Sequence, residues 1–161
     1  MAFPQTRPDG FMLSEDQALL DLDRCYEWLA GSYWASDRSR ETMERSFQNS
    51  LVIGAYSPSG EQIGLARAVT DGVTFAWLAD VYVDESARGR GIGTWMTGEL
   101  VAALKANGLR RFMLGTRDAH GVYAKVGFTA PRVPQVLMEL DERPTRPNGE
   151  DVDPAAFAGR S

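Results

Sequence analysis

The chain contains a single cysteine, Cys25, and a single histidine, His120. One cysteine excludes an internal disulfide, and one cysteine with one histidine leaves no cluster for a structural zinc, so we expect no metal. No apolar run approaches the ~20 residues that span a bilayer, and residues 1–13 lack the basic and apolar regions of a signal peptide. We therefore expect a cytoplasmic protein with no membrane partner.

The chain also has no excess of positive charge. Its formal net charge is -5 at pH 7, and its isoelectric point is about 4.9. Broad binding to nucleic acid requires a positive field that displaces counterions from phosphates, so we expect no nucleic-acid partner. The 161 residues, 43% of them hydrophobic, suffice for one domain with a sizeable core but are few for two. Any anion site must then come from a local group of basic residues.

Turn residues and hydrophobic spacing predict a single mixed α/β (α+β) domain between two outer segments. Residues 1–10 carry two prolines and a glycine and predict a flexible arm that becomes ordered near Phe11. Residues 141–161 hold few large apolar groups and cannot repay the entropy of ordering, which predicts a disordered tail. The domain itself is expected to cover residues 11–140.

Within the domain, apolar residues three and four apart predict helices, and apolar runs bounded by turn residues predict strands. The first helix has Asp21 and Ser14 as alternative N-caps and Gly31 beyond its end. Predicted helices cover residues 22–29, 40–49, 92–107 and 119–126. Predicted strands cover residues 50–57, 62–70, 74–83, 110–116 and 135–140, and residues 11–14 are compatible with one more short strand.

A glycine-rich turn between a predicted strand and a predicted helix is the strongest functional signal, in the segment ADVYVDESARGRGIGTWM. Gly89, Gly91 and Gly93 allow a tight turn whose amides converge at a helix N-terminus, an arrangement that binds phosphate or pyrophosphate. A nucleotide triphosphatase loop is excluded because Thr94 follows Gly93 without a lysine. A dinucleotide-binding fingerprint is excluded as well, because Thr94 and Met96 stand where its third glycine would be.

The remaining pattern is Arg or Gln, two residues, Gly, one residue, then Gly or Ala, and residues 88–93 (RGRGIG) match it. With this motif the sequence resembles the GNAT superfamily of acyl-CoA-dependent N-acyltransferases. The preceding LADVYV and the later HGVYAKVGF add to the resemblance, which covers about residues 50–140. It implies a mixed, mostly antiparallel sheet that splays between its fourth and fifth strands and is flanked by helices. It also implies acetyl-CoA as co-substrate and transfer of the acetyl group to a primary amine, small or amino-acid-like.

The resemblance also implies where acetyl-CoA binds. Loop amides would hold the pyrophosphate, two arginines would add charge, and the backbone of the fourth strand would bond the pantetheine arm. The matching positions are Val81, Val83, Arg88, Gly89, Arg90, Gly91, Ile92, Gly93 and Thr94.

Two residues are candidates for proton transfer. The resemblance implies that Tyr123 protonates the departing thiolate of CoA. Asp80 lies in an otherwise apolar strand, where an unpaired carboxylate would be costly, so it is a candidate base or else an anchor for a neighbouring backbone group or arginine. Polyamine acetyltransferases of the superfamily often have a Glu-Asp pair where this chain has Ala79-Asp80. Cys25 has no base beside it, so we expect direct attack by the amine and no acyl-cysteine.

Four further residues are candidates for the acceptor site. By position, Tyr33 and Trp34 could form an aromatic wall or belong to the core. His120 shares a helix face with Tyr123 and could relay a proton, touch the acceptor or cap the helix. Thr116 stands where many family members have asparagine. Two alternatives remain for the function: a non-catalytic acyl-CoA sensor on the same fold, and an acetyltransferase of protein amines. A homodimer is compatible with either.

Overall fold

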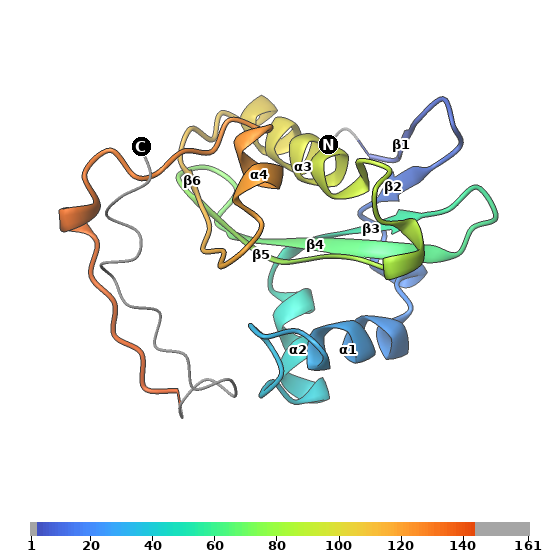
Figure 1. Cartoon of the computed structure of the whole chain (residues 1–161), viewed down its shortest axis with the longest axis horizontal. Helices are drawn as coiled ribbons and strands as arrows, with labels where there is room; N and C mark the ends of the chain where they lie inside the picture. Colours follow the sequence, from blue (N-terminus) through green and yellow to red (C-terminus); the bar gives the residue numbers. More distant parts are fainter. Residues whose placement is uncertain (1–2, 144–161) are drawn as a thin grey trace.

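One sheet of six strands organises the computed structural model, which describes residues 3–143. Its strands, in the order in which they lie side by side, are β1 (Gln5–Thr6), β2 (Met12–Ser14), β3 (Leu51–Tyr56), β4 (Gln62–Thr70), β5 (Ala76–Val83) and β6 (Phe112–Met113). Neighbouring strands are antiparallel except for β5 and β6, which run parallel. The mixed, mostly antiparallel sheet predicted from the sequence is therefore confirmed (Figure 1).

The sheet opens between β5 and β6. These strands pair only where Ala76 faces Phe112 and Trp77 faces Met113. Residues 78–83 of β5 are therefore paired with β4 on one side, and β6 has ended on the other. This opening is the splay that was predicted between the fourth and fifth strands. The two strands are numbered β5 and β6 here because the short strand β1, which was not predicted, precedes them.

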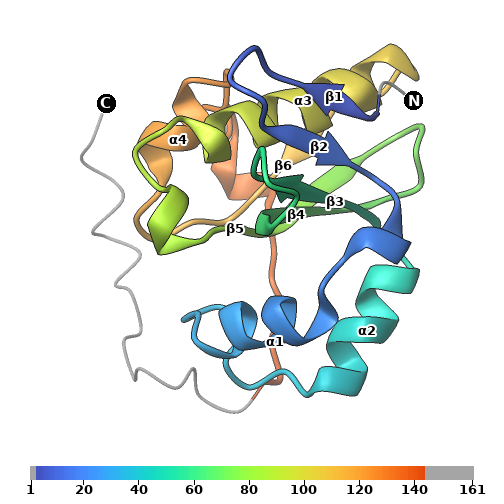
Figure 2. The same ribbon diagram turned by 90° about the vertical axis from the view of Figure 1, so that its right-hand side faces the viewer.

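Helices cover both faces of the sheet (Figures 1 and 2). On one face lie α3 (Ile92–Ala106) and α4 (His120–Ala124), and on the other lie α1 (Leu22–Ala30) and α2 (Arg40–Gln48). The alternation of side chains along β3 divides the core accordingly, because Ile53 packs with the α3 residues and Val52 with those of α1 and α2. Asp21 is the N-cap of α1, which decides between the two caps that the sequence allowed.

The N-terminal segment differs from the flexible arm that the sequence predicted. Gln5–Thr6 form an edge strand paired with β2, and the Arg7 amide donates to the Phe11 carbonyl at 2.8 Å to close the hairpin. The Arg7 guanidinium pairs with Asp9 and donates to the Arg90 carbonyl at 3.1 Å. It also lies over the rings of Phe11 and Trp95. The contacts with Arg90 and Trp95 join parts of the chain that are far apart in sequence, which local turn signals could not indicate.

The C-terminal part of the described chain also differs, because residues 135–140 do not form the predicted strand. The 3-10 helix η3 (Pro134–Val136) is followed by an unpaired segment that runs away from the sheet (Figure 1). Met138 and Leu140 are 98% and 88% exposed. The two-residue strand β6 offers too short an edge to pair with. The predicted strand over 110–116 shrinks to Phe112–Met113, and the tail predicted to be disordered lies outside the described residues from 144 on.

Candidate active site

The glycine-rich turn joins the open end of β5 to α3, with the 3-10 helix η2 (Glu85–Ala87) before it. Gly89 and Gly91 have φ angles of 76° and 72°, in the left-handed region that other residues avoid. Gly91 is the N-cap of α3 and brings no capping side chain. The amides of residues 89–94 donate no hydrogen bond to any group in residues 3–143. The turn therefore presents free donors at the positive end of a helix, as an anion site requires.

The two arginines of the turn lie on different sides of it. Arg88 donates from Nε to the Val83 carbonyl at 3.0 Å and lies over the ring of Tyr82, so its position is fixed beside β5. The Arg90 guanidinium instead lies over the Phe11 ring, on the side of the N-terminal hairpin. Only Arg88 is therefore placed to add positive charge to the cleft described below.

A β-bulge in β5 carries the candidate base. Opposite β4, Tyr82 faces Leu65 and Ala79 faces Arg67, so that two residues of β5 stand against one of β4. Asp80 is one of these two β5 residues and has a φ of 51°, the single positive value among non-glycine residues within 3–143. Such a backbone costs on the order of 1–3 kcal/mol and persists only where neighbouring contacts hold it.

Those contacts come from two arginines and an indole. The Asp80 side chain is completely buried, and its Oδ2 accepts from Arg38 and from Arg67, each at 2.7 Å. Its Oδ1 accepts from the Trp34 indole N–H at 3.2 Å. Arg67 also donates to the Ser50 hydroxyl at 3.0 Å. Both carboxylate oxygens of Asp80 are thus occupied by protein donors, an arrangement typical of an anchoring carboxylate rather than of one that faces an incoming amine.

Tyr123, the candidate acid, lies on α4. Its ring meets that of Phe128 edge-on, with centroids 6.1 Å apart. Burial raises the pKa of Tyr123 to about 12, and the nearby Tyr33 and Asp118 add to the shift. Its hydroxyl makes no hydrogen bond with the residues that the structure describes, so the phenol is protonated at neutral pH and free to donate to a ligand.

The other acceptor-site candidates hold two segments together. The Tyr33 hydroxyl accepts from the Arg117 amide at 3.0 Å, and the Arg117 guanidinium lies 4.0 Å from the centre of the Tyr33 ring. Tyr33 also meets Trp34 edge-on at 5.0 Å. The Thr116 hydroxyl accepts from the Ala119 amide at 3.0 Å, next to the start of α4. Thr116 thus contributes to the turn that positions Tyr123.

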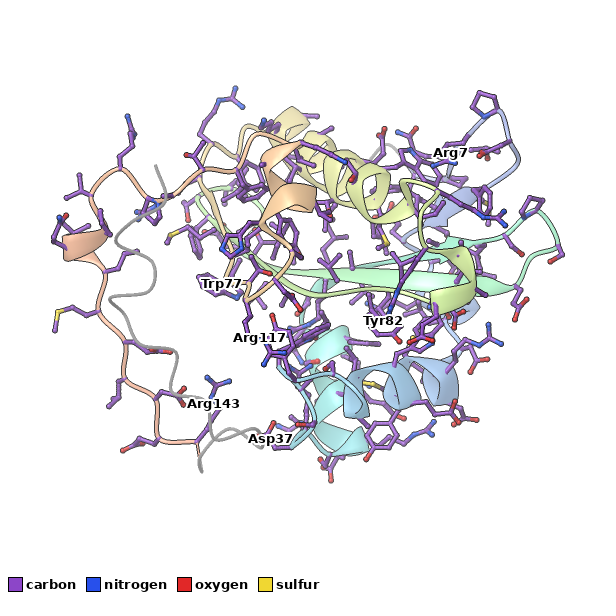
Figure 3. All side chains as sticks on the ribbon, in the orientation of Figure 1. Arg7, Asp37, Trp77, Tyr82, Arg117 and Arg143 are labelled. Atoms are coloured by element: carbon purple, nitrogen blue, oxygen red, sulfur yellow. The ribbon has the colours of Figure 1, made fainter. Side chains whose placement is uncertain are left out.

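One open cleft of about 1400 Å³ runs between these elements, from the glycine-rich turn past β5 to the connection between α1 and α2. All predicted site residues line it except Arg90 and His120. The lining also includes Trp77, Tyr82 and Arg117, which Figure 3 labels between the α4 side of the molecule and the α1–α2 layer. The structure therefore brings the turn, the open edge of β5, Asp80 and Tyr123 to one cavity.

Arg38 and Arg67 line the cleft beside Asp80, and neither was predicted from the sequence. A signal for Arg67 was present, because a lone arginine in the apolar run QIGLARAVT could have been matched with the lone aspartate of the adjacent antiparallel strand. Arg38 lies in the connection between α1 and α2, and no spacing rule relates that connection to β5.

Cys25 lies in the core between α1 and the sheet and is completely buried. Burial raises the pKa of its thiol to about 11, and Gln62 donates to its Sγ at 3.4 Å. A neutral thiol outside the cleft cannot act as an acyl acceptor. Among residues 3–143 there is no group of three or more potential metal ligands, and none of the helices there is long and apolar enough to cross a membrane.

Comparison with known proteins identifies the family of this chain. Residues 17–128 match the model of the "Acetyltransferase (GNAT) family". The chain belongs to the GNAT acetyltransferase family. A crystal structure of a candidate GNAT acetyltransferase from Xanthomonas campestris pv. campestris superposes with a TM-score of 0.76 at 39% identity, over 81% of this chain and 92% of that one.

Two curated relatives agree with this assignment. The candidate acetyltransferase FG08082 of Gibberella zeae is 34% identical over 140 residues, which cover 74% of this chain and 78% of the relative. Serotonin N-acetyltransferase 2, a chloroplastic protein of Oryza sativa subsp. japonica, is 33% identical over 96 residues, 56% of this chain and 48% of its own length. The GNAT domain identifies this chain as an acyl-CoA-dependent acetyltransferase, whose donor in the family is acetyl-CoA.

Proposed function

We propose that this GNAT acetyltransferase transfers the acetyl group of acetyl-CoA directly to the primary amine of a small, amino-acid-like molecule. The observation that carries the proposal is the common cleft, because the unoccupied amides of residues 89–94 and the Tyr123 hydroxyl open onto one cavity. The donor binds at the turn and along β5, and the acceptor enters from the side of Trp34. No covalent enzyme intermediate is required, since the one cysteine is buried elsewhere.

Donor binding uses backbone groups in two places. The amides of residues 89–94 bond the pyrophosphate, and Arg88 adds positive charge. The pantetheine arm lies along residues 81–83, where the outer edge of β5 has no paired strand. The side chains of Val81 and Val83 pack against the α3 side of the core, so the contribution of these residues is that of their main chain. Holding the thioester here places its carbonyl beside Tyr123.

Tyr123 supplies the proton for the departing sulfur. The Tyr123 phenol has a pKa of about 12, whereas a thiol usually has a pKa near 8.5. Complete transfer of the proton from this phenol to a thiolate of ordinary pKa is therefore uphill by roughly 5 kcal/mol. Burial in the cleft also raises the pKa of the departing thiolate, because low polarity disfavours any anion. The difference narrows as the C–S bond breaks, so the proton is donated along a short hydrogen bond late in the reaction.

Asp80 acts as an anchor in this proposal, the alternative that the sequence left open. Its two guanidinium partners and its indole partner occupy both carboxylate oxygens. The amine therefore reaches the thioester already neutral or loses its proton to water first. After the attack its nitrogen loses one further proton to water as the C–S bond breaks, and Tyr123, which has protonated the sulfur, takes a proton back from water. Polyamines, which suit an acidic site with a free carboxylate pair, fit this cleft poorly.

The test compares Tyr123→Phe with Tyr56→Phe. Burial raises the pKa of each tyrosine to about 12, but Tyr56 lies outside the cleft and serves as a matched control. Acetyl-CoA consumption is followed with a panel of amines, and CoA affinity by calorimetry. Tyr123→Phe should lower kcat by roughly 10²–10⁴-fold and leave CoA affinity unchanged. Tyr56→Phe should change neither kcat nor CoA affinity. Equal kcat in Tyr123→Phe and the parent would discard the acid role.

The same assay separates the rival functions. A sensor would bind CoA and consume no acetyl-CoA with any amine. An enzyme acting on protein amines would acetylate lysine-containing or N-terminal peptides in preference to free amino acids. Serotonin belongs in the panel because the rice relative is named for it, and the aromatic lining by Tyr33 and Trp34 could accommodate an indole.

A homodimer and a cytoplasmic location are also part of the proposal. Support for the dimer comes from residues 133–140, where five large apolar side chains are exposed. Their exposed fractions are 54% for Val133, 70% for Val136, 42% for Leu137, 98% for Met138 and 88% for Leu140. Several exposed large apolar side chains in one short segment are typical of a contact with another protein surface, and a second copy is the simplest partner.

A further inference from the structure

We propose that the acceptor carries a carboxylate beside its amine and that Arg38 and Arg67 bind this carboxylate. The inference rests on the proposed function and narrows its substrate class. In the cleft wall two arginines, Arg38 and Arg67, form ion pairs with the same buried carboxylate, that of Asp80.

Both arginines keep donors that nothing else in the described chain uses. Arg38 donates through one nitrogen, Nη1, to Asp80, while its Nε and Nη2 make no hydrogen bond with residues 3–143. Arg67 uses Nε for Asp80 and Nη1 for Ser50, which leaves its Nη2 without a partner in the same range. Their side chains are only 20% and 10% exposed, and both residues line the cleft. The unused nitrogens are not among the buried atoms that lack a partner, so solvent reaches them through the cleft, and a ligand oxygen that replaces water there can accept from them.

The charge of the cluster points to a ligand with one negative charge. Two guanidinium groups and one carboxylate give a formal charge of +1, in a protein whose overall formal charge is -5. The other acids that line the cleft, Asp37, Glu85, Asp118 and Glu139, are exposed and partly screened by water. A carboxylate neutralises the surplus, whereas a phosphate dianion would leave a negative charge among buried groups. The planar fork of an arginine also matches the two oxygens of a carboxylate.

The position of the cluster suits an acceptor rather than the donor. Asp80 directly precedes Val81, whose main chain belongs to the proposed path of the pantetheine arm, so an acceptor held at Arg38 and Arg67 lies next to the thioester. The donor's own phosphates are accounted for at the glycine-rich turn, which lies at the opposite end of residues 80–91. Trp34 and Tyr33 flank the cluster and leave room for a side chain of the acceptor along the aromatic wall.

The experiment uses acceptors that differ only in the carboxylate. Common amino acids are each compared with their carboxamides and with the corresponding decarboxylated amines, including 5-hydroxytryptophan beside serotonin. O-phosphoethanolamine beside β-alanine tests a phosphate. We expect kcat/KM for the best amino acid to exceed that for its amide by roughly 10- to 100-fold, which is the usual effect of hydrogen bonds to a charged group. The difference should lie mainly in KM.

The variants are Arg38→Gln and Arg38→Lys, with Arg40→Gln as the matched control. Arg40 is near in sequence but pairs with Asp23 and Glu44 and does not line the cleft. Arg38→Gln should lower kcat/KM for the amino acid at least about tenfold more than it lowers kcat/KM for the amide. Arg38→Lys should restore part of the preference, and Arg40→Gln should change neither acceptor. CoA affinity measured in each variant confirms that the fold is intact.

The outcomes separate this inference from the proposed function. Acetylation of amines with no preference for a carboxylate, or an equal loss for acid and amide in Arg38→Gln, overturns the inference and leaves the acetyltransferase in place. A preference for O-phosphoethanolamine over β-alanine overturns the choice of a carboxylate. Binding of CoA with no acetylation of any small amine overturns the proposed function, and the inference with it.

Discussion

Replacing Asp80 by asparagine tests how strongly the buried ion pairs hold the acceptor side of the fold. Asparagine keeps the shape of the side chain and tolerates a positive φ, so the loss reports the charge rather than the backbone at φ 51°. Two largely buried guanidinium groups would lose their counter-charge. Removing one partner of a buried pair costs about 3–5 kcal/mol, and the partial exposure of Arg38 places Asp80→Asn near about 3 kcal/mol.

That loss is a large part of the 5–15 kcal/mol by which a domain is usually stable. For a chain of this length it corresponds to a fall in melting temperature of roughly 6–12 °C. The assay is thermal and urea unfolding of Asp80→Asn beside Asp23→Asn. Asp23 forms an ion pair with Arg40, but its side chain is 78% exposed. Asp23→Asn should therefore unfold at the same temperature and the same urea concentration as the parent. If Asp80→Asn also unfolded with the parent, the two arginines would not depend on the carboxylate, and the account of the bulge would fail.

Four further predictions follow from single observations. Gly91→Ala, with no clash but a φ of 72°, should lose about 1–2 kcal/mol of stability and bind CoA more weakly in calorimetry, because relaxing the backbone would turn the loop amides away. Tyr56→Phe removes a buried hydroxyl with no partner among the described residues, so urea unfolding should show equal or about 1 kcal/mol higher stability. Cys25, with a pKa of about 11, should react with a thiol reagent at pH 8.5 only in denaturant; reaction in the native protein would contradict its burial. Met138→Ser with Leu140→Ser should leave a dilute monomer as stable as the parent but weaken dimerisation in sedimentation.

Local sequence signals predicted the strand, the glycine-rich turn and the helix at one end of the cleft. A strand, a turn that needs glycines and a helix are consecutive, so the positions of residues 79–96 relative to one another follow from backbone rules alone. The left-handed values at Gly89 and Gly91 agree with that reasoning. The open sheet followed from family resemblance rather than from periodicity, because no local pattern shows where two strands stop pairing.

The acceptor side could not be predicted because its contacts join distant parts of the chain. Asp80 is 42 residues from Arg38 and 13 from Arg67 along the chain. The sequence indicated that Asp80 needed a partner but not which one. The predicted strand over residues 135–140 was wrong for a related reason. Residues 136–138 form an apolar run that is compatible with a strand, but a strand forms only where another strand offers an edge.

The bulge in β5 links the two sides of the cleft physically. The extra residue that turns the Asp80 carboxylate toward Arg38 and Arg67 also sets the register of Tyr82 and of the open edge beyond it. In the proposed function, donor and acceptor are therefore positioned by consecutive residues of one strand, and the backbone between them has one strained conformation. Since the ion pairs hold that conformation, we expect Asp80 to shape the proposed path of CoA without touching it. Arg38 comes from a separate connection, and Arg67 and Trp34 would still bond Asp80 if Arg38 were changed. We therefore expect a substitution of Arg38 to alter acceptor specificity with a smaller effect on β5 than a substitution of Asp80 has.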